Sequence, residues 1–156
     1  RLKCPEGERS TVYDAILVPT DGSEGVDRTL EHAVEMARRY DASIHALYVV
    51  DRRFELAADE DREDLVERLT ERGGAAVAAV AEAAEDAGVD AVTDVREGIP
   101  YKTILDYAAE ADVDVIAMGT HGRTGRDRLA HLGSVTDRVV ENASVPVFVV
   151  NIGDGD

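Results

Sequence analysis

Cysteine is nearly absent from this chain of 156 residues, in which Cys4 is the only one. A single cysteine excludes an internal disulfide and any metal site built from several cysteines. Long apolar runs are absent as well: none approaches the ~20 residues that a helix needs to cross a bilayer, and no secretion signal is recognisable near the start. We therefore expect a cytoplasmic protein without a membrane span.

Lysine is scarce, since Lys3 and Lys102 are the only two among 17 basic residues, whereas Asp and Glu total 33. The resulting net charge of −16 disfavours binding to nucleic acids or anionic membranes, because their phosphates would be repelled. Many carboxylates, few lysines and an aromatic content of 4% indicate a halophilic protein, one that must stay soluble in very high salt, where self-repulsion is screened. The alternative is an ordinary acidic protein.

Short apolar or alternating runs predict five strands, at residues 15–18, 44–50, 91–95, 113–118 and 145–150. Helical spacing of apolar residues predicts a helix between each strand and the next, with Ser23 as the N-cap of the first helix and Gly88 ending the second. This alternation predicts an α/β fold, a single doubly wound open parallel five-stranded sheet with helices on both faces. We expect the domain to span residues 13–152, with a mobile tail at 1–12 and a short tail at 153–156.

The second predicted helix contains two adjacent glycines, Gly73 and Gly74. Together they cost about 2 kcal/mol relative to alanines in a helix. Such a pair indicates either a kink or a place where another backbone comes close.

Two loops at the expected carboxyl ends of strands carry the candidate chemistry, because open parallel sheets bind ligands there, where the strand order reverses. The first loop is residues 19–23 (PTDGS), in which Asp21 is either a turn residue or a site residue. The second is residues 119–125 (GTHGRTG), whose three glycines let a backbone turn tightly and let an anion approach its amides.

A helix start further along the chain adds donors for an anion. Gly133, Ser134 and Val135 offer N–H groups at the positive end of the last predicted helix. The hydroxyls of Ser134 and Thr136 are further candidate donors. From this spacing alone, a phosphate site and a simple tight turn are equally good interpretations of these residues.

Common catalytic and nucleotide motifs are missing. The P-loop G-x-x-x-x-G-K-[ST], the dinucleotide motif G-x-G-x-x-G and the nucleophile elbow G-x-S-x-G do not occur. His121 has no partner cysteine or third ligand in evidence, so a solvated loop histidine is favoured over a general base or metal ligand. Arg123 is the candidate phosphate ligand among three nearby arginines, which are equally suited to pairing with surface carboxylates.

Three segments together resemble the universal stress protein family: residues 16–24 (ILVPTDGSE), 119–122 (GTHG) and 133–135 (GSV). The resemblance covers about residues 13–150. ATP-binding members of that family carry G-x-x-G-x(9)-G-[ST], and this chain matches it except that ten residues, one more than in the family, separate Gly122 from Gly133. The resemblance implies the adenine nucleotide alpha hydrolase-like fold with strand order 3-2-1-4-5, in which the first and fourth strands lie side by side.

The resemblance also implies an ATP site. The segment from Pro19 to Asp21 would meet the adenine and ribose, Val49 would lie against the base, and the glycine loop with the last helix start would hold the phosphates. A divalent metal, Mg²⁺ or Mn²⁺, would be held mainly by those phosphates. With Arg123 added as a phosphate ligand, the candidate nucleotide-binding residues are Pro19, Thr20, Asp21, Val49, Met118, Gly119, Gly122, Arg123, Gly133, Ser134 and Val135.

The implied strand order leaves the last strand at a sheet edge, where residues 147–150 (VFVV) carry no charge or proline to guard it. We therefore predict a homodimer that pairs these strands across a two-fold axis. The leading hypothesis for function is an ATP-binding module of the stress response. A dimeric interaction scaffold that binds no nucleotide and a slow ATPase or nucleotidyl transferase are the alternatives. Binding is favoured over catalysis, because nothing in the sequence supplies the activated base or paired carboxylates that efficient hydrolysis needs.

Overall fold

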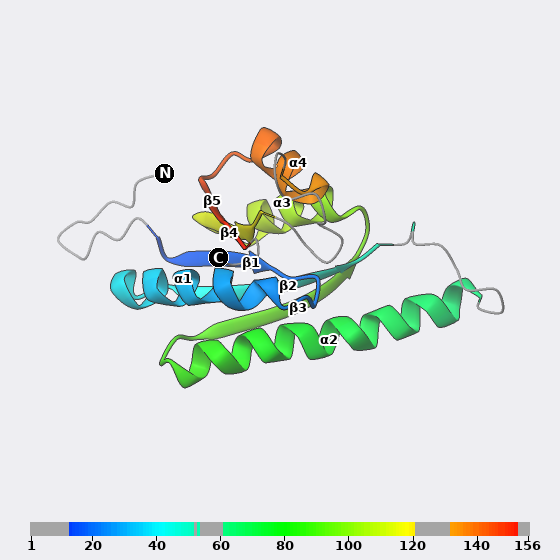
Figure 1. Cartoon of the computed structure of the whole chain (residues 1–156), viewed down its shortest axis with the longest axis horizontal. Coiled ribbons are helices and arrows are strands. Elements are labelled where there is room, and N and C mark those ends of the chain that lie inside the picture. The colour runs from blue at the N-terminus through cyan, green and yellow to red at the C-terminus, as the bar shows by residue number, and fades with distance from the viewer. Residues whose placement is uncertain (1–12, 52, 54–60, 121–131, 153–156) are drawn as a thin grey trace.

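Five parallel strands and four helices alternate along the part of the chain that the computed structural model describes, residues 13–51, 53, 61–120 and 132–152. The elements are β1 (Ala15–Pro19), α1 (Gly25–Tyr40), β2 (Ser43–Val50), α2 (Arg62–Asp86), β3 (Ala91–Glu97), α3 (Pro100–Glu110), β4 (Val115–Gly119), α4 (Ser134–Asn142) and β5 (Val147–Val150). The strand order is β3-β2-β1-β4-β5 (Figure 1). The predicted fold class and the implied strand order are therefore confirmed.

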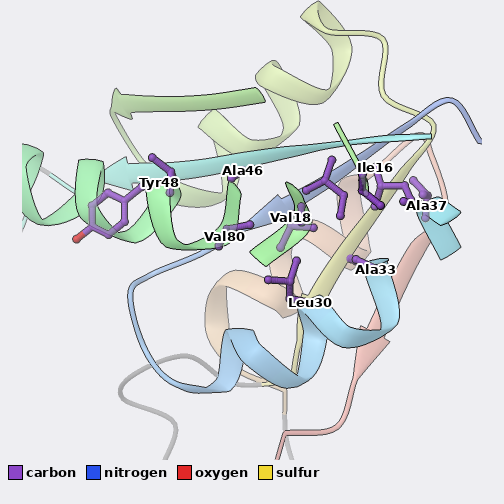
Figure 2. Close-up of a cluster of buried hydrophobic side chains, with 14 of the residues drawn as sticks. Ile16, Val18, Leu30, Ala33, Ala37, Ala46, Tyr48 and Val80 are labelled. Atoms are coloured by element: carbon purple, nitrogen blue, oxygen red, sulfur yellow. The ribbon is translucent and has the colours of Figure 1, made fainter. Parts of the chain in front are cut away.

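Helices cover both faces of the sheet, with α1 and α2 on one face and α3 and α4 on the other (Figure 1). The central strand β1 is almost fully buried, because each of its faces has a hydrophobic core against it. Ile16 and Val18 face the first core with Leu30 and Ala33 of α1 (Figure 2), whereas Leu17 lies in the second core under α3 and α4. The apolar run of the first strand thus reflects burial from both sides.

The long helix α2 runs across the first face without interruption through its two glycines. Its N-cap is Asp61, whose side chain accepts a hydrogen bond from the Asp64 N–H at 2.9 Å. Its end agrees with the prediction, since Gly88 has the left-handed φ of 83° that follows a helix terminus. The aromatic ring of Tyr48 packs against Gly73, so the close approach comes from a side chain of β2 and not from a backbone.

Several predicted boundaries differ from the structure. Ser23 is not the N-cap of α1: Glu24 holds that position without a side-chain cap, because Ser23 still belongs to the preceding turn, where its N–H donates to the Asp21 carboxylate. Strand β3 continues two residues further than predicted, and β5 begins two residues later. Pro146, just before β5, still accepts a hydrogen bond from the Ile116 N–H at 3.0 Å.

The predicted tails at residues 1–12 and 153–156 lie outside the described residues. Among the helices that the structure describes, none is both long enough and apolar enough to span a membrane.

Candidate functional site

A cavity of about 450 Å³ opens where the strand order reverses, beyond the carboxyl ends of β1 and β4. These two strands are neighbours in the sheet, but the chain leaves β1 for α1 and β4 for α4 on opposite faces, so a crevice forms between the two connections. Most of the predicted site residues line this cavity: Pro19, Thr20, Asp21, Val49, Met118, Gly119, Gly133, Ser134 and Val135. Gly122 and Arg123, like His121, lie outside the described residues.

The turn after β1 is held by its own side chains. The Thr20 N–H donates to the Leu47 carbonyl at 2.9 Å, which keeps the turn beside the end of β2. The Thr20 hydroxyl accepts from the Gly22 N–H and the Asp21 carboxylate accepts from the Ser23 N–H, each at 3.0 Å. Asp21 is therefore a turn residue that also lines the cavity, so the two interpretations of this residue are compatible.

The start of α4 offers fewer donors than the sequence predicted. The Gly133 N–H already donates to the Thr120 carbonyl at 2.7 Å, so it is not a free anion donor. The Thr136 hydroxyl donates to the Gly119 carbonyl at 2.8 Å, so it fixes α4 to the end of β4 instead of adding a donor. In the described part of the chain, no backbone carbonyl accepts from the N–H groups of Ser134 and Val135. The Thr136 N–H likewise has no backbone acceptor among the described residues, so these three amides and the Ser134 hydroxyl are the donors that remain at this helix terminus.

The side of the cavity formed by β2, α3 and the end of β4 is apolar. Leu47, Ile104 and Met118 belong to the second hydrophobic core and line the cavity, and the half-buried Val49 packs against that core. Apolar walls of this kind suit an aromatic ring more than a phosphate. The cavity thus has an apolar region beside β2 and a polar region beside the start of α4.

A charged pair at the rim was not predicted. Asp51, which follows β2, binds the Arg53 guanidinium through both carboxylate oxygens, at 3.0 and 3.1 Å. Partial burial raises the pKa of Asp51, but the hydrogen bonds and charge of Arg53 outweigh this effect, so the pKa lies below its ordinary value. The pair places a basic group beside the cavity, in a segment where the sequence shows only a run of charges.

The residues on the α1 side of the cavity were also not predicted from the sequence. It is lined by Gly25, Thr29 and Ile152, which come from the two ends of the described chain, together with Tyr48 and Leu69. Neither spacing nor composition links Ile152 to α1, because only the place of β5 beside β4 in the sheet brings them together.

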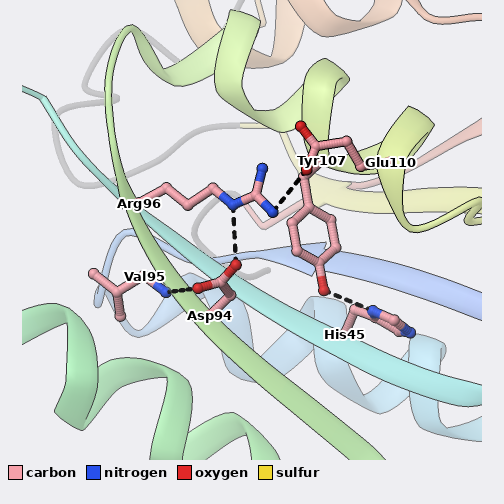
Figure 3. Close-up of polar contacts among 6 residues, drawn as sticks. All are labelled: His45, Asp94, Val95, Arg96, Tyr107 and Glu110. Carbon is pink, nitrogen blue, oxygen red and sulfur yellow. Dashed lines mark hydrogen bonds and ion pairs between the residues drawn. The ribbon is translucent and has the colours of Figure 1, made fainter.

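A second polar cluster joins β2, β3 and α3 without lining the cavity (Figure 3). The Nδ1 atom of His45 lies 2.7 Å from the Tyr107 hydroxyl, and the Arg96 guanidinium lies over the Tyr107 ring, 4.8 Å from its centre. Arg96 also pairs with Asp94 at 2.9 Å and with Glu110 at 3.0 Å. Burial lowers the pKa of His45 and raises that of Tyr107, which favours the neutral form of each group.

The protein has an open parallel sheet with a cavity at its switch point. Gly119 ends β4 at this cavity, and the N-terminus of α4 faces it. These features define a doubly wound α/β protein, a class in which ligands are bound at the strand ends. The sequence profile of the Universal stress protein family matches residues 13–151, so the chain belongs to that family.

Individual relatives agree with this assignment. The chain is 40% identical over 141 residues to universal stress protein MJ0531 of Methanocaldococcus jannaschii, covering 89% of this chain and 82% of that protein. It is 31% identical to universal stress protein MJ0577 of the same organism, whose structure matches with a TM-score of 0.82 and covers 93% of this chain and 100% of that one. Two more distant structures have the same fold. A universal stress protein in complex with cAMP is 21% identical with a TM-score of 0.70, and the match covers 90% of this chain and 98% of that one. The universal stress protein from Archaeoglobus fulgidus in complex with dAMP is 22% identical with a TM-score of 0.64, and the match covers 90% of this chain and 99% of that one.

Proposed function

We propose that this universal stress protein is an adenine-nucleotide-binding module of the stress response in the cytoplasm, and that its ligand is ATP. The observation that carries the proposal is the convergence of three separate sequence segments on one cavity: the turn after β1, the end of β4 and the start of α4. Each segment has sequence features that suit a different part of the nucleotide. Their meeting at the switch point supports a single ligand that contacts all three.

In the proposed arrangement, the adenine lies on the apolar side of the cavity, with Val49 against the base and Asp21 beside the ribose. The phosphates lie against the amides of Ser134 and Val135, where the helix N-terminus favours negative charge. Gly122 and Arg123 are assigned to the same phosphates on the family motif alone. This placement matches the chemistry of each wall, since the apolar wall takes the ring and the helix terminus takes the charge.

A divalent metal fits the proposal only as a partner of the phosphates. The described residues contain no group of three or more His, Cys, Asp and Glu side chains that could hold a metal ion. Bound with ATP, Mg²⁺ or Mn²⁺ would neutralise part of the phosphate charge. Asp21 is the carboxylate on the cavity wall that lies on the proposed nucleotide path.

The two complexes with cAMP and dAMP come from structures below 25% identity, so they inform the fold alone. They show that the fold holds adenine nucleotides in other proteins. The proposal for this chain therefore rests on its own residues, and the direct test is the identity of any ligand. Denaturing the purified protein and identifying the released nucleotide by mass spectrometry is expected to yield ATP or ADP.

Two alternatives predict different results. A scaffold that binds no nucleotide predicts neither a released nucleotide nor heat on titration with ATP at millimolar concentration, in molar KCl with Mg²⁺. A slow ATPase predicts measurable release of phosphate with Mg²⁺. The proposal expects tight binding with turnover far below that of an efficient enzyme, because the described residues that line the cavity place no pair of carboxylates and no oriented base beside the start of α4.

We also propose a homodimer through β5, whose outer edge has no neighbouring strand in the described sheet. Phe148 at the middle of this strand is 38% exposed, and its ring lies 5.8 Å from that of His32 on α1. Pairing with a second copy across a two-fold axis would cover the edge and part of this ring. Light scattering at micromolar concentration is expected to give the mass of a dimer.

A further inference from the structure

The two residues after β5, Asn151 and Ile152, form a strap from the last strand to the first turns of α1. The Ile152 N–H donates to the Thr120 hydroxyl at 3.2 Å, and the Arg28 guanidinium donates to the Asn151 carbonyl at 3.2 Å. Both hydrogen bonds are long for their kind. These hydrogen bonds and the side chain of Ile152 hold the strap at the cavity.

The Ile152 side chain lies on two glycines. A Cβ atom on Gly25 would overlap the Ile152 Cδ1 atom and stand 3.5 Å from its Cγ1 atom. A Cβ atom on Gly119 would stand 3.0 and 3.1 Å from the Cδ1 and Cγ2 atoms of Ile152. The Ile152 side chain can therefore lie here only because Gly25 of α1 and Gly119 of β4 have no side chains.

Beneath this position lies a buried hydroxyl without a hydrogen bond. Thr29 is only 1% exposed, and its Oγ1 atom has no hydrogen-bond partner among the residues that the structure describes. The atom is directed at the end of β4, since it would lie 3.3 Å from a Cβ atom on Gly119, and Thr29 lines the cavity. A buried hydroxyl without a partner is unfavourable, so its presence calls for an explanation.

Thr136 is a second buried threonine beside Gly119, and its hydroxyl has a hydrogen-bond acceptor. It is 5% exposed and approaches Gly119 from α4, on the opposite face of the sheet from α1. Its hydroxyl donates to the Gly119 carbonyl at 2.8 Å. Two buried threonines therefore flank the end of β4, and only the one beside Ile152 lacks a partner.

The amides of α1 do not by themselves make an anion site here. The Val26 and Asp27 N–H groups point to the carbonyls of Ser23 and Glu24, at 3.4 and 3.1 Å. Two carboxylates, those of Glu24 and Asp27, also stand at this helix start. Attraction for an anion would come from the Thr29 hydroxyl and from the Arg28 guanidinium, which the strap now engages.

We propose that Ile152 covers a phosphate subsite, and that the terminal phosphate of a bound nucleotide displaces its side chain. A phosphate chain that starts at α4 and passes Gly119 comes within reach of Thr29, whose hydroxyl then donates to a phosphate oxygen. Release of the strap frees Arg28 to neutralise charge. The inference rests on the proposed function for the nucleotide, and it adds that Thr29 selects ligands with a long phosphate chain over AMP.

The first test compares two substitutions at Thr29. Thr29→Val removes the hydroxyl and keeps the shape, so it is expected to lower the affinity for ATP about tenfold, as the loss of a hydrogen bond to a charged group does. The affinity for AMP is expected to stay within about twofold. Thr29→Ser keeps the hydroxyl and is expected to retain ATP binding. Equal ATP affinity of wild type and Thr29→Val, by isothermal titration, would overturn the subsite.

Stability without ligand provides a matched control. Thr29→Val is expected to leave the melting temperature unchanged or raise it, because the hydroxyl that it removes has no partner. Thr136→Val is expected to lower the melting temperature, because it leaves the Gly119 carbonyl without its donor. If Thr29→Val lowered the melting temperature as much as Thr136→Val, the Thr29 hydroxyl would have a structural partner and the proposal would be wrong.

The strap itself can be followed by the NMR signal of the Ile152 δ1 methyl group in the whole chain. Tripolyphosphate, which carries no base, is expected to shift this signal, and adenosine is expected to leave it in place. A signal unmoved by both tripolyphosphate and ATP would overturn the subsite even if adenosine binds. A signal moved by tripolyphosphate in a protein that binds ATP no more tightly than tripolyphosphate would uphold the subsite and refute the proposed function.

Discussion

The adjacent glycines of α2 provide a test of packing, because an added methyl group meets different surroundings at each. A Cβ atom on Gly73 would overlap the Tyr48 Cδ1 atom and stand 2.8 Å from Cγ and 3.0 Å from Cε1. Carbon atoms in contact prefer about 3.5–4.0 Å, so the ring or the helix would have to move. A Cβ atom on Gly74 would have nothing within 4 Å. Replacement by alanine should therefore lower the stability of the protein at Gly73 and raise it at Gly74.

The size of the difference follows from two opposing effects. Alanine is more favourable than glycine in a helix by about 1 kcal/mol, and this gain applies at both positions. At Gly73 the added methyl group overpacks the core, which costs about 1–3 kcal/mol. The ring cannot swing away easily, because Tyr48 is 3% exposed and the atoms in conflict belong to the edge of its ring and not to its hydroxyl end. We expect Gly73→Ala to be about 1–3 kcal/mol less stable than Gly74→Ala.

Urea or thermal unfolding of the two variants, in the same concentrated KCl buffer, measures this difference. A change of 1 kcal/mol corresponds to about 2–4 °C in melting temperature for a chain of this size. Tyr48→Leu in the Gly73→Ala background should recover part of the loss, because the smaller side chain leaves room for the methyl group. Equal melting temperatures for Gly73→Ala and Gly74→Ala would refute the packing of Tyr48 on Gly73.

Four further predictions concern pH, salt, the ligand and assembly. The pKa of His45 is lowered in the folded protein, so its neutral form contributes stability above its unfolded pKa of about 6.5. This stability is lost as the pH falls below that value. His45→Gln should therefore weaken the dependence of the melting temperature on pH between about 7.5 and 5.5. With 33 carboxylates, the melting temperature should rise strongly from low to molar KCl, and an unchanged value would argue against adaptation to salt. Asp21→Ala should weaken the binding of adenosine and ATP alike, whereas Ser134→Ala should weaken ATP more than adenosine, and isothermal titration of both ligands would expose a uniform loss for Ser134→Ala as a contradiction. Val149→Lys on β5 should give monomers or insoluble protein by light scattering, and a monomeric wild type would rule out the dimer.

Much of the architecture follows from local sequence pattern. Runs such as residues 15–18 and 44–50 are apolar because covered parallel strands have no solvent face, and this property is visible in the order of the residues. The alternation of these runs with helical segments predicts the layers. Strand ends are less well defined by sequence, and β3 continues to Glu97 because pairing with β2, from Ile44 to Val50, holds its polar residues extended.

The family motif predicts most of the residues that line the cavity, but it does not assign individual donors. In the sequence, the N–H of Gly133 and the hydroxyl of Thr136 look equivalent to the same groups of Ser134, yet both bind the end of β4 or the residue after it. Whether a donor faces a ligand or the protein depends on the angle at which α4 meets β4. That angle results from packing between segments distant in the chain, which spacing does not record.

By itself, the sequence determined the alternation of strands and helices, the acidic charge and the glycines at the strand ends, because each is a property of neighbouring residues. The tertiary structure alone decided which distant residues share the cavity. Ile152 meets Gly25 only because β5 runs beside β4 and directs the chain toward α1. Tyr48 meets Gly73 only because α2 crosses β2 at that turn. Contacts of this kind depend on how the layers pack, and they determine the shape of the cavity into which a ligand must fit.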